Sequence, residues 1–230
     1  MPKAEVSSIF KKARSQKRNV LTPVESARVL AAYGIPIAKG TLITKKEELA
    51  KAKFPVVMKV VSPDLLHKTE SATVAVGIKS LEEANLAFDT LISNAKKAKR
   101  NVKIDGILVQ EMLSGTELIV GSSRDVQFGQ TLMFGIGGIF VEVMKDVTFR
   151  VIPVSKYDIS EMLHEIKAQK VLSGVRGKAP INQNIVQSIL LKTSQLLQDC
   201  PQIKELDINP LFADDKGAKA ADARIILEVN

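Results

Sequence analysis

The sequence has one cysteine, no tryptophan and few aromatic residues of any kind, which make up 4% of its 230 residues. A single cysteine, Cys200, excludes an internal disulfide and a cysteine-based zinc site, and it predicts a reducing, cytoplasmic setting. The scarcity of aromatic rings leaves little surface on which nucleic-acid bases stack, so we expect no nucleic-acid partner. No apolar run approaches ~18 residues, and residues 1–19 lack the apolar middle of a secretory signal. We therefore expect no membrane partner.

The remaining composition is that of an ordinary globular protein, with 45% hydrophobic and 25% charged residues. The chain is long enough for one large domain or two modest ones. The net charge is +8, and residues 1–19 contribute +5 of it, because six basic residues oppose Glu5 alone. We interpret residues 1–19 as a basic, flexible arm exposed to solvent, with an anionic partner surface as the alternative function of this arm.

Capping residues and apolar spacing predict a mixed α/β protein. Thr22-Pro23-Val24-Glu25 is typical of a helix start, and this helix should run toward Tyr33 and stop at Gly34. Thr44 with Glu47 predicts a short helix ending near Lys53, and Ser80 with Glu83 predicts a longer one. Further helices are expected at 158–169 and 181–199, and strands at 56–61, 106–111, 117–121, 130–134, 139–143, 149–152, 203–208 and 223–228. Because helices and strands do not alternate strictly, we expect two adjoining lobes rather than a doubly wound sheet.

Lys59 interrupts the apolar run Val56-Val57-Met58-Lys59-Val60-Val61, which otherwise is typical of a buried strand. Removing an ammonium group from water costs several kcal/mol unless negative charge compensates it. Lys59 therefore predicts a contact with a phosphate or nucleotide in a cleft. The alternative is a lysine that reaches solvent from an edge strand.

The polar segment after this strand holds His67, one of two histidines in the chain. Neutral imidazole is a good nucleophile near pH 7, and Asp64 and Glu70 are placed to orient its second nitrogen. A single loop histidine is also compatible with an ordinary surface position. His164 lies in an amphipathic segment, and we assign no chemistry to it.

Glycines cluster in Phe134-Gly135-Ile136-Gly137-Gly138-Ile139, a stretch that permits close backbone approach to an anion. It matches neither the dinucleotide fingerprint nor a P-loop, and a bulge or tight turn explains it equally well. The charged continuation of this stretch includes Arg150. Its guanidinium is a candidate to neutralise a transferring phosphoryl group.

Near the end of the chain, Asp207 and Asn209 are two residues apart on a predicted strand and so share one of its faces. Asp222 precedes the last strand and would face Asn209 if the two strands pair as a hairpin. Oxygen ligands of this kind suit Mg²⁺ that is held jointly with substrate phosphates. Taken alone, such polar pairs are also ordinary turn residues.

Five segments in one order resemble the ATP-grasp (beta) subunit of ADP-forming acetyl-CoA (acyl-CoA) synthetases. The segments are Pro55–Lys59, His67–Glu70, Gln110–Met112, Phe134–Glu142 and Leu206–Leu211. The resemblance covers residues 20–230, and the beta subunit of succinyl-CoA synthetase is a more distant relative. It implies an α/β (mixed α+β) ATP-grasp fold whose two lobes, at 20–110 and 111–230, clamp a nucleotide.

The resemblance also implies a reaction: acetyl-CoA, ADP and phosphate are interconverted with acetate, CoA and ATP. The cofactors would be ATP or ADP and Mg²⁺. The ATP-grasp subunit would pass phosphoryl between nucleotide and a phosphohistidine carried by a separate CoA-binding alpha subunit, in an α2β2 heterotetramer. Nothing in this sequence resembles the CoA-binding unit, so the chain alone should not complete the reaction.

The resemblance assigns roles to individual residues. Lys59 should contact the nucleotide phosphates, Glu111 and Met112 should lie on the linker that reads the adenine edge, and Glu117 should approach the ribose. Asn209 and Asp222 correspond to magnesium ligands, Asp207 to an acid that steadies the phosphohistidine, and His67 to a second histidine that relays phosphoryl.

One departure concerns Ser71-Ala72-Thr73, which stands where the family has glycines, so the phosphate-cradling role of this loop is open. Two alternative functions are another ATP-grasp ligase, which joins a carboxylate to an amine, and a non-enzymatic basic module that acts through the arm.

Overall fold

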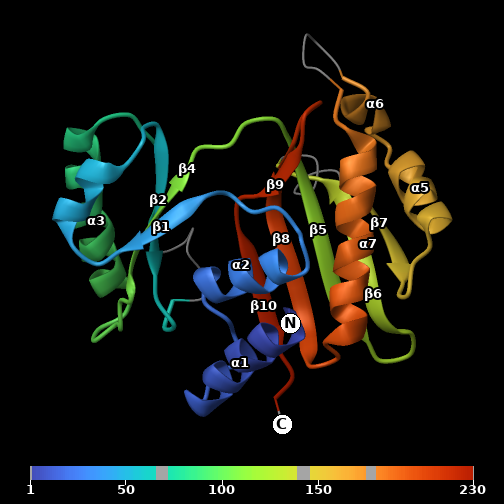
Figure 1. Cartoon of the computed structure of the whole chain (residues 1–230), viewed down its shortest axis with the longest axis horizontal. Helices are drawn as coiled ribbons and strands as arrows, with labels where there is room; N and C mark the ends of the chain where they lie inside the picture. Colours follow the sequence, from blue (N-terminus) through green and yellow to red (C-terminus); the bar gives the residue numbers. More distant parts are fainter. Residues whose placement is uncertain (1, 66–71, 139–145, 175–179, 230) are drawn as a thin grey trace. The chain divides into compact units, whose positions relative to one another are not determined.

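The computed structural model describes residues 2–65, 72–138, 146–174 and 180–229. The chain forms two compact units (Figure 1). Unit 1 comprises Met1–Leu21, Glu25–Ile37 and Leu113–Asn230, and unit 2 comprises Thr22–Val24 and Ala38–Met112. This division differs from the predicted ranges 1–19, 20–110 and 111–230, because most of the N-terminal segment packs with the C-terminal half.

Unit 2 is a four-stranded antiparallel sheet in the order β1-β4-β2-β3, with helix α3 packed on it. Its apolar core includes Leu49, Met58, Leu91 and Ile107, all at most 2% exposed. Its elements are β1 (Gly40–Ile43), the 3-10 helix η1 (Lys46–Lys51), β2 (Val56–Val61), β3 (Val74–Ile78), α3 (Leu81–Ala98) and β4 (Gly106–Glu111).

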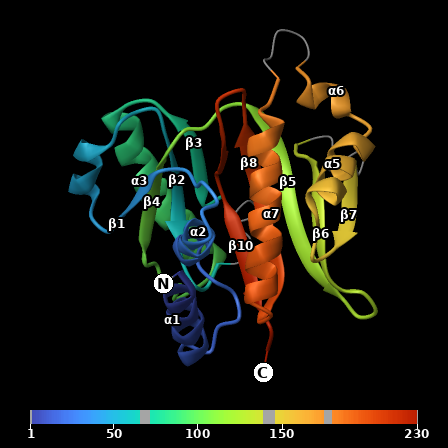
Figure 2. The same ribbon diagram turned by 45° about the vertical axis from the view of Figure 1, so that its right-hand side comes forward.

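Unit 1 contains a six-stranded antiparallel sheet in the order β10-β8-β5-β6-β7, with β9 paired to β8. Figures 1 and 2 both show α7 lying along one face of this sheet, with α5 beside it. The strands are β5 (Thr116–Asp125), β6 (Gly129–Ile136), β7 (Val147–Val151), β8 (Ile203–Ala213), β9 (Ala218–Ala220) and β10 (Ala223–Leu227). The helices are α1 (Pro2–Ser15), α2 (Pro23–Ala32), α5 (Lys156–Glu165), α6 (Gln169–Leu172) and α7 (Gln183–Asp199).

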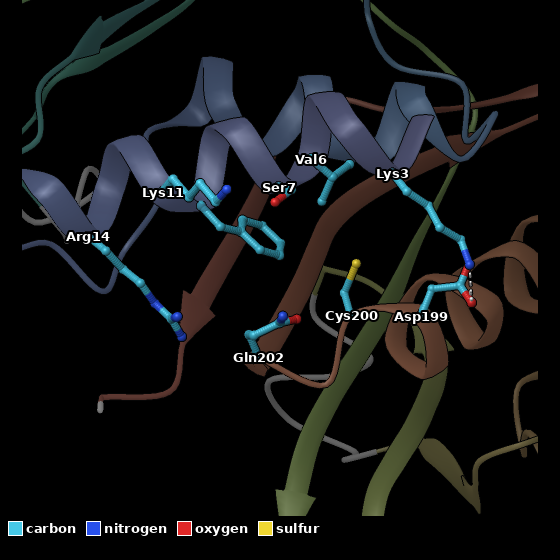
Figure 3. Close-up of a pocket in the computed structure, with 9 residues that line it drawn as sticks. Lys3, Val6, Ser7, Lys11, Arg14, Asp199, Cys200 and Gln202 are labelled. Atoms are coloured by element: carbon cyan, nitrogen blue, oxygen red, sulfur yellow. Dashed lines mark ion pairs between the residues drawn. The ribbon is translucent and has the colours of Figure 1, made fainter. Parts of the chain in front are cut away.

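The prediction of a flexible arm at the N-terminus is wrong, because Pro2–Ser15 form helix α1. Val6, Ile9, Phe10 and Ala13 recur at helical spacing and are at most 5% exposed in the core of unit 1. Helix α1 lines one side of a pocket of 190 Å³. Figure 3 shows Asp199, Cys200 and Gln202 across this pocket from the helix. Burial of this apolar stripe outweighs the solvation of the basic residues of the helix, which stay exposed.

The chain after α1 is also fixed within unit 1. Residues 19–21 pair with the edge of β10, through the amide N–H of Leu21 bonded to the Ile225 carbonyl and that of Leu227 bonded to the Asn19 carbonyl. Arg18 forms a bidentate pair with Glu25 at 2.9 and 3.0 Å, and both side chains are about nine-tenths buried. The net charge of residues 1–19 is therefore not that of a solvated tail.

Several predicted elements differ in extent from those observed. The expected helix near 44–53 is the 3-10 helix η1, and Glu48 rather than Glu47 accepts the capping bonds from the amides of Thr44 and Lys45. The expected helix 158–169 is divided into α5 and α6, because the Asp146 carboxylate accepts the amide N–H groups of Lys167 and Ala168 between them. The predicted strand 139–143 lies outside the described residues. No helix in the described ranges is long and apolar enough to cross a membrane.

Candidate functional site

The unit 1 sheet has two faces of different chemical character, and the strand register separates them. One cross-strand row contains Arg150, Leu132, Ser122, Leu206 and Ile225, and its leucines and isoleucine are at most 1% exposed against the helices. The adjacent row therefore points to the other side. It contains Arg224, Asp207, Gly121, Met133 and Phe149, and we call this side the site face.

Asp207 lies at the centre of the site face, half-buried on β8 between two strands. On one side it pairs with Gly121, where an added Cβ would lie 2.7 Å from the terminal methyl of Met133. On the other side it pairs with Arg224, which is exposed. Burial raises the pKa of the Asp207 carboxyl, the charge of Arg224 lowers it, and that of Asp222 raises it further. The sequence analysis missed Arg224, although alternation along the last strand would have placed it opposite Asp207.

Asn209 and Asp222 are brought together, as the predicted hairpin requires. β8 and β10 pair antiparallel, and the register from Ala223–Ile208 continues to this pair, where the Asn209 amide N–H donates to the Asp222 carbonyl at 3.3 Å. Asn209 is exposed on the same side of β8 as Asp207. The side-chain oxygens of an amide and a carboxylate fit Mg²⁺, which takes its other ligands from water and phosphates. Within the described ranges no three His, Cys, Asp or Glu side chains form a metal-binding group by themselves.

Glu117 on β5 lies against the glycine-rich segment that follows β6. The Gly137 amide N–H donates to the Glu117 carbonyl at 2.7 Å, and a Cβ on Gly137 would lie 3.3 Å from the backbone and Cβ of Glu117. Gly138 has a φ of +63°, a conformation that glycine adopts without steric cost, and its Cβ position is 3.4 Å from the Glu117 carboxylate. The glycines thus allow this segment to pass directly beside Glu117. Residues 139–145 lie outside the described part of the chain.

Arg150 lies on the opposite face of the sheet from Asp207. Its guanidinium donates to both carboxylate oxygens of Glu165 on α5, at 2.6 and 3.0 Å. Thr148, two residues earlier, donates to the Met162 carbonyl of the same helix at 3.4 Å. The structure therefore does not bring Arg150 together with Asp207, and we leave Arg150 out of the site.

Lys59 occupies the middle of β2 in unit 2, paired with Val74 on β3 and Leu108 on β4. Its neighbours Met58 and Val60 are at most 3% exposed, and Lys59 itself is 7% exposed. Because β2 is flanked on both sides, Lys59 is not the edge-strand lysine of the alternative interpretation.

Glu111 and Met112 stand at the end of β4, where the chain leaves unit 2. The amide N–H of Glu111 donates to the Lys39 carbonyl at 2.9 Å, and its carboxylate accepts from the Lys39 amide at 2.8 Å. That amide is therefore already bonded within unit 2. Met112, the next residue, is 45% exposed.

His67, Glu70 and Ser71 lie outside the described residues. Asp64, expected to orient His67, is engaged elsewhere: its carboxylate accepts from the Lys103 amide at 2.7 Å and from Lys99 Nζ at 2.9 Å. These bonds lower the pKa of Asp64. Ala72 has a φ of +46°, a left-handed conformation that favours glycine. Its backbone thus adopts a conformation suited to the glycine that the resemblance predicts in this loop.

The chain is similar to several known proteins. A family model described as an ATP-grasp domain matches residues 12–227. The beta subunit of ADP-forming acetate–CoA ligase I from Pyrococcus furiosus is 44% identical over 229 residues, which cover 97% of this chain and 98% of that subunit. ADP-forming 4-hydroxybutyrate–CoA ligase from Nitrosopumilus maritimus is 41% identical over 97% of this chain but only 33% of its own length.

Solved structures of acetyl-coenzyme A synthetase 1 from Ca. Korarchaeum cryptofilum share this fold. One, in complex with coenzyme A and Ca-AMPCP, has a TM-score of 0.92 and 41% identity over 96% of this chain and 99% of that one. Another is bound to coenzyme A and Mg-AMPPCP, with its phosphohistidine segment pointing towards the nucleotide binding site. The predicted fold and family are thereby confirmed. The chain belongs to the ATP-grasp family, and within it to the beta subunits of ADP-forming acetate–CoA ligases.

Proposed function

We propose that this chain binds ATP or ADP with Mg²⁺ and exchanges phosphoryl with a phosphohistidine that an alpha subunit delivers. The N–P bond of the phosphohistidine breaks and an O–P bond to the terminal phosphate of ADP forms, giving ATP and neutral histidine. The observation that carries the proposal is the cluster of Asp207, Asn209 and Asp222 on paired strands of one sheet, in a chain that aligns end to end with known beta subunits.

Each part of the site has a defined role in this proposal. Lys59 supplies positive charge to the nucleotide phosphates, and Met112 and Glu117 border the adenosine. Asn209 and Asp222 hold Mg²⁺, which supplies charge neutralisation at the phosphates, and Asp207 accepts a hydrogen bond from the incoming imidazole. Phosphoryl transfer demands chiefly alignment and charge neutralisation from a protein, and these side chains provide both. His67 relays the phosphoryl group between the two sites, and its structure lies outside the described residues.

The partner and its stoichiometry are part of the proposal. The 4-hydroxybutyrate ligase carries the equivalent of this chain as one third of a longer polypeptide. We propose that the remaining functions reside here in a separate CoA-binding alpha subunit, in an α2β2 assembly, and that the enzyme acts in the cytoplasm. Acetyl-CoA is the proposed acyl substrate.

The test uses the purified chain together with its alpha partner and ATP labelled at the γ-phosphate. We expect acid-labile label on histidine of both subunits in the presence of Mg²⁺, and loss of the label on this chain in His67→Ala. A parent complex that forms no phosphohistidine would disprove the proposed function. If turnover of His67→Ala were unchanged, only the relay role of His67 would be disproved, and the rest of the proposed function would stand.

A further inference from the structure

With Arg150 assigned to the other side of the sheet, Arg224 is the basic residue beside Asp207 in the described rows of the site face. Three successive rows of this face are defined by the register. Their members on β8 and β10 are Glu205 with Ile226, Asp207 with Arg224, and Asn209 with Asp222. Their members on β5, β6 and β7 are uncharged: Ser123, Thr131 and Val151 in the first row, and Gly121, Met133 and Phe149 in the second. At the third row the β5–β8 register shifts, and Ile119, Gly135 and Val147 continue it across β5, β6 and β7. The described rows thus hold one basic residue, Arg224, and three carboxylates, of which that of Glu205 lies 3.9 Å from Lys204 Nζ.

A phosphorylated imidazole that approaches Asp207 would meet repulsion from these carboxylates. Like charges a few ångströms apart near a protein surface repel strongly, because the effective dielectric constant there is well below that of water. Mg²⁺ held by Asn209 and Asp222 would offset this repulsion at the nucleotide. The phosphoryl group on the histidine side needs a second positive charge.

Arg224 is positioned to supply it. Directly paired residues on antiparallel strands have Cβ atoms about 5 Å apart, so the side chains of Asp207 and Arg224 stand next to each other on one face. Arg224 is exposed, and its guanidinium forms no ion pair within 4 Å with any other residue that the structure describes. Arg150 and Arg18, by contrast, are each held in a bidentate carboxylate pair. Arg224 therefore has its donors available for a ligand.

We propose that Arg224 and Asp207 grip the two ends of the phosphohistidine. Asp207 accepts the hydrogen bond of the ring N–H, and the guanidinium of Arg224 donates to two phosphoryl oxygens. Planar bidentate donation to phosphate is the geometry in which arginine surpasses lysine. No bond forms to Arg224; it holds the oxygens while the N–P bond breaks and the phosphoryl group leaves for its acceptor. This role rests on the proposed function and adds a residue to it.

The test compares Arg224→Gln and Arg224→Lys in the reconstituted complex with the alpha partner. The phosphorylated partner is mixed with Mg-ADP, and ATP formation is followed in a single turnover. We expect Arg224→Gln to slow the transfer about 100-fold, the usual loss for one donor to a developing charge. The transfer rate of Arg224→Lys should lie between those of Arg224→Gln and the parent, because lysine keeps the positive charge but not the planar pair of donors.

Two further measurements separate this role from others. Arg124→Gln is the matched control, because Arg124 lies on the same sheet but bonds the Pro201 carbonyl and Glu228; its transfer rate should equal that of the parent. The gain in melting temperature with Mg-ADP should be the same in Arg224→Gln and in the parent, since Arg224 acts on the histidine side.

The outcomes distinguish the inference from the function on which it rests. The inference would be wrong if Arg224→Gln transferred phosphoryl at the rate of the parent. It would also be wrong if the variant lost its thermal stabilisation by Mg-ADP to an extent that explains the slower transfer. Either result would leave the proposed function standing. A parent complex that makes no ATP from the phosphorylated partner would overturn both.

Discussion

At the scale of single residues, the sequence predicted which side chains share a face where they alternate along one regular strand. It failed where the face depends on how neighbouring strands pair. Asp207 and Asn209 were placed on one face from their spacing of two, and the structure agrees. Arg150 was chosen because it follows the glycine-rich stretch, but only the register shows that it belongs to the row of Leu132 and Leu206. One residue of shift along a strand reverses the face, so proximity in sequence could not decide between Arg150 and Arg224.

Lys59→Ala tests the proposed phosphate contact in unit 2. We expect it to weaken ATP binding tens of times, because a charged hydrogen bond contributes about 2 kcal/mol. The gain in melting temperature with Mg-ATP measures this loss. Lys79→Ala, an exposed lysine of the same unit, is the control and should keep the full gain. Equal gains for Lys59→Ala and the parent would contradict the assignment.

Asp207→Asn should separate stability from function. Burial raises the pKa of Asp207, so its ionised form destabilises the fold at neutral pH. This cost begins to shrink as the pH falls below the raised pKa and is gone below the ordinary pKa of an aspartate. We expect the apo variant to be more stable than the parent at pH 7, on the order of 1 kcal/mol, with the difference shrinking in acid, while phosphoryl transfer is lost. Urea unfolding at several pH values measures the difference. A less stable variant at pH 7 would refute the argument.

Ala72→Gly tests whether the loop that departs from the family pattern carries backbone strain. A residue other than glycine in the left-handed conformation, such as Ala72, lowers the stability of the fold by about 1–2 kcal/mol. Glycine removes this strain, but it also increases the entropy of the unfolded chain, which cancels part of the gain in stability. We expect a small increase in melting temperature. Ala87→Gly, the same change inside α3, should instead lower stability by about 1 kcal/mol. If both variants lose stability equally, position 72 is unstrained.

At the scale of elements, strong hydrophobic periodicity was sufficient to predict a helix or a strand. Where a predicted element differs from the observed one, tertiary contacts explain the difference. β2 and β4 have their predicted limits, because both are apolar runs bounded by turn residues. β1, β3 and β9 were missed, since each has at most five residues and little buried surface of its own. The α5–α6 break could not be predicted, because it depends on Asp146, a residue distant in sequence.

Helix α1 is the clearest element-scale error, and it is directly testable. Its apolar stripe has the helical spacing of residues 6, 9, 10 and 13, but the six basic residues around it favoured a solvated arm. Phe10→Ala should lower the free energy of unfolding by about 3 kcal/mol, the cost of truncating a buried phenylalanine. Lys11→Ala, next to it and exposed, should change stability by less than ~0.5 kcal/mol. Denaturant melts of both variants measure this, and equal stabilities would restore the arm interpretation.

At the scale of the whole molecule, five weak motifs in order identified the family, whereas no single one would have. Lys59 lies in unit 2 and Asp207, Asn209 and Asp222 lie in unit 1, so the residues to which we assign roles come from distant parts of the sequence. Their order along the sequence carried information that composition and periodicity did not. The alpha partner, too, was implied by the family resemblance and not by any single residue.

That dependence on a partner gives the last prediction. The purified chain, supplied with Mg-ATP, acetate and CoA, should form no acetyl-CoA, because the residues we assign here handle nucleotide and phosphoryl but none binds the thiol or the acyl group. Adding the alpha subunit should start the reaction and shift this 25.1 kDa chain into a larger complex. Light scattering after gel filtration gives its mass, and a product assay follows turnover. Ligation by the chain alone, or an active mixture in which the two proteins elute apart, would contradict a divided enzyme.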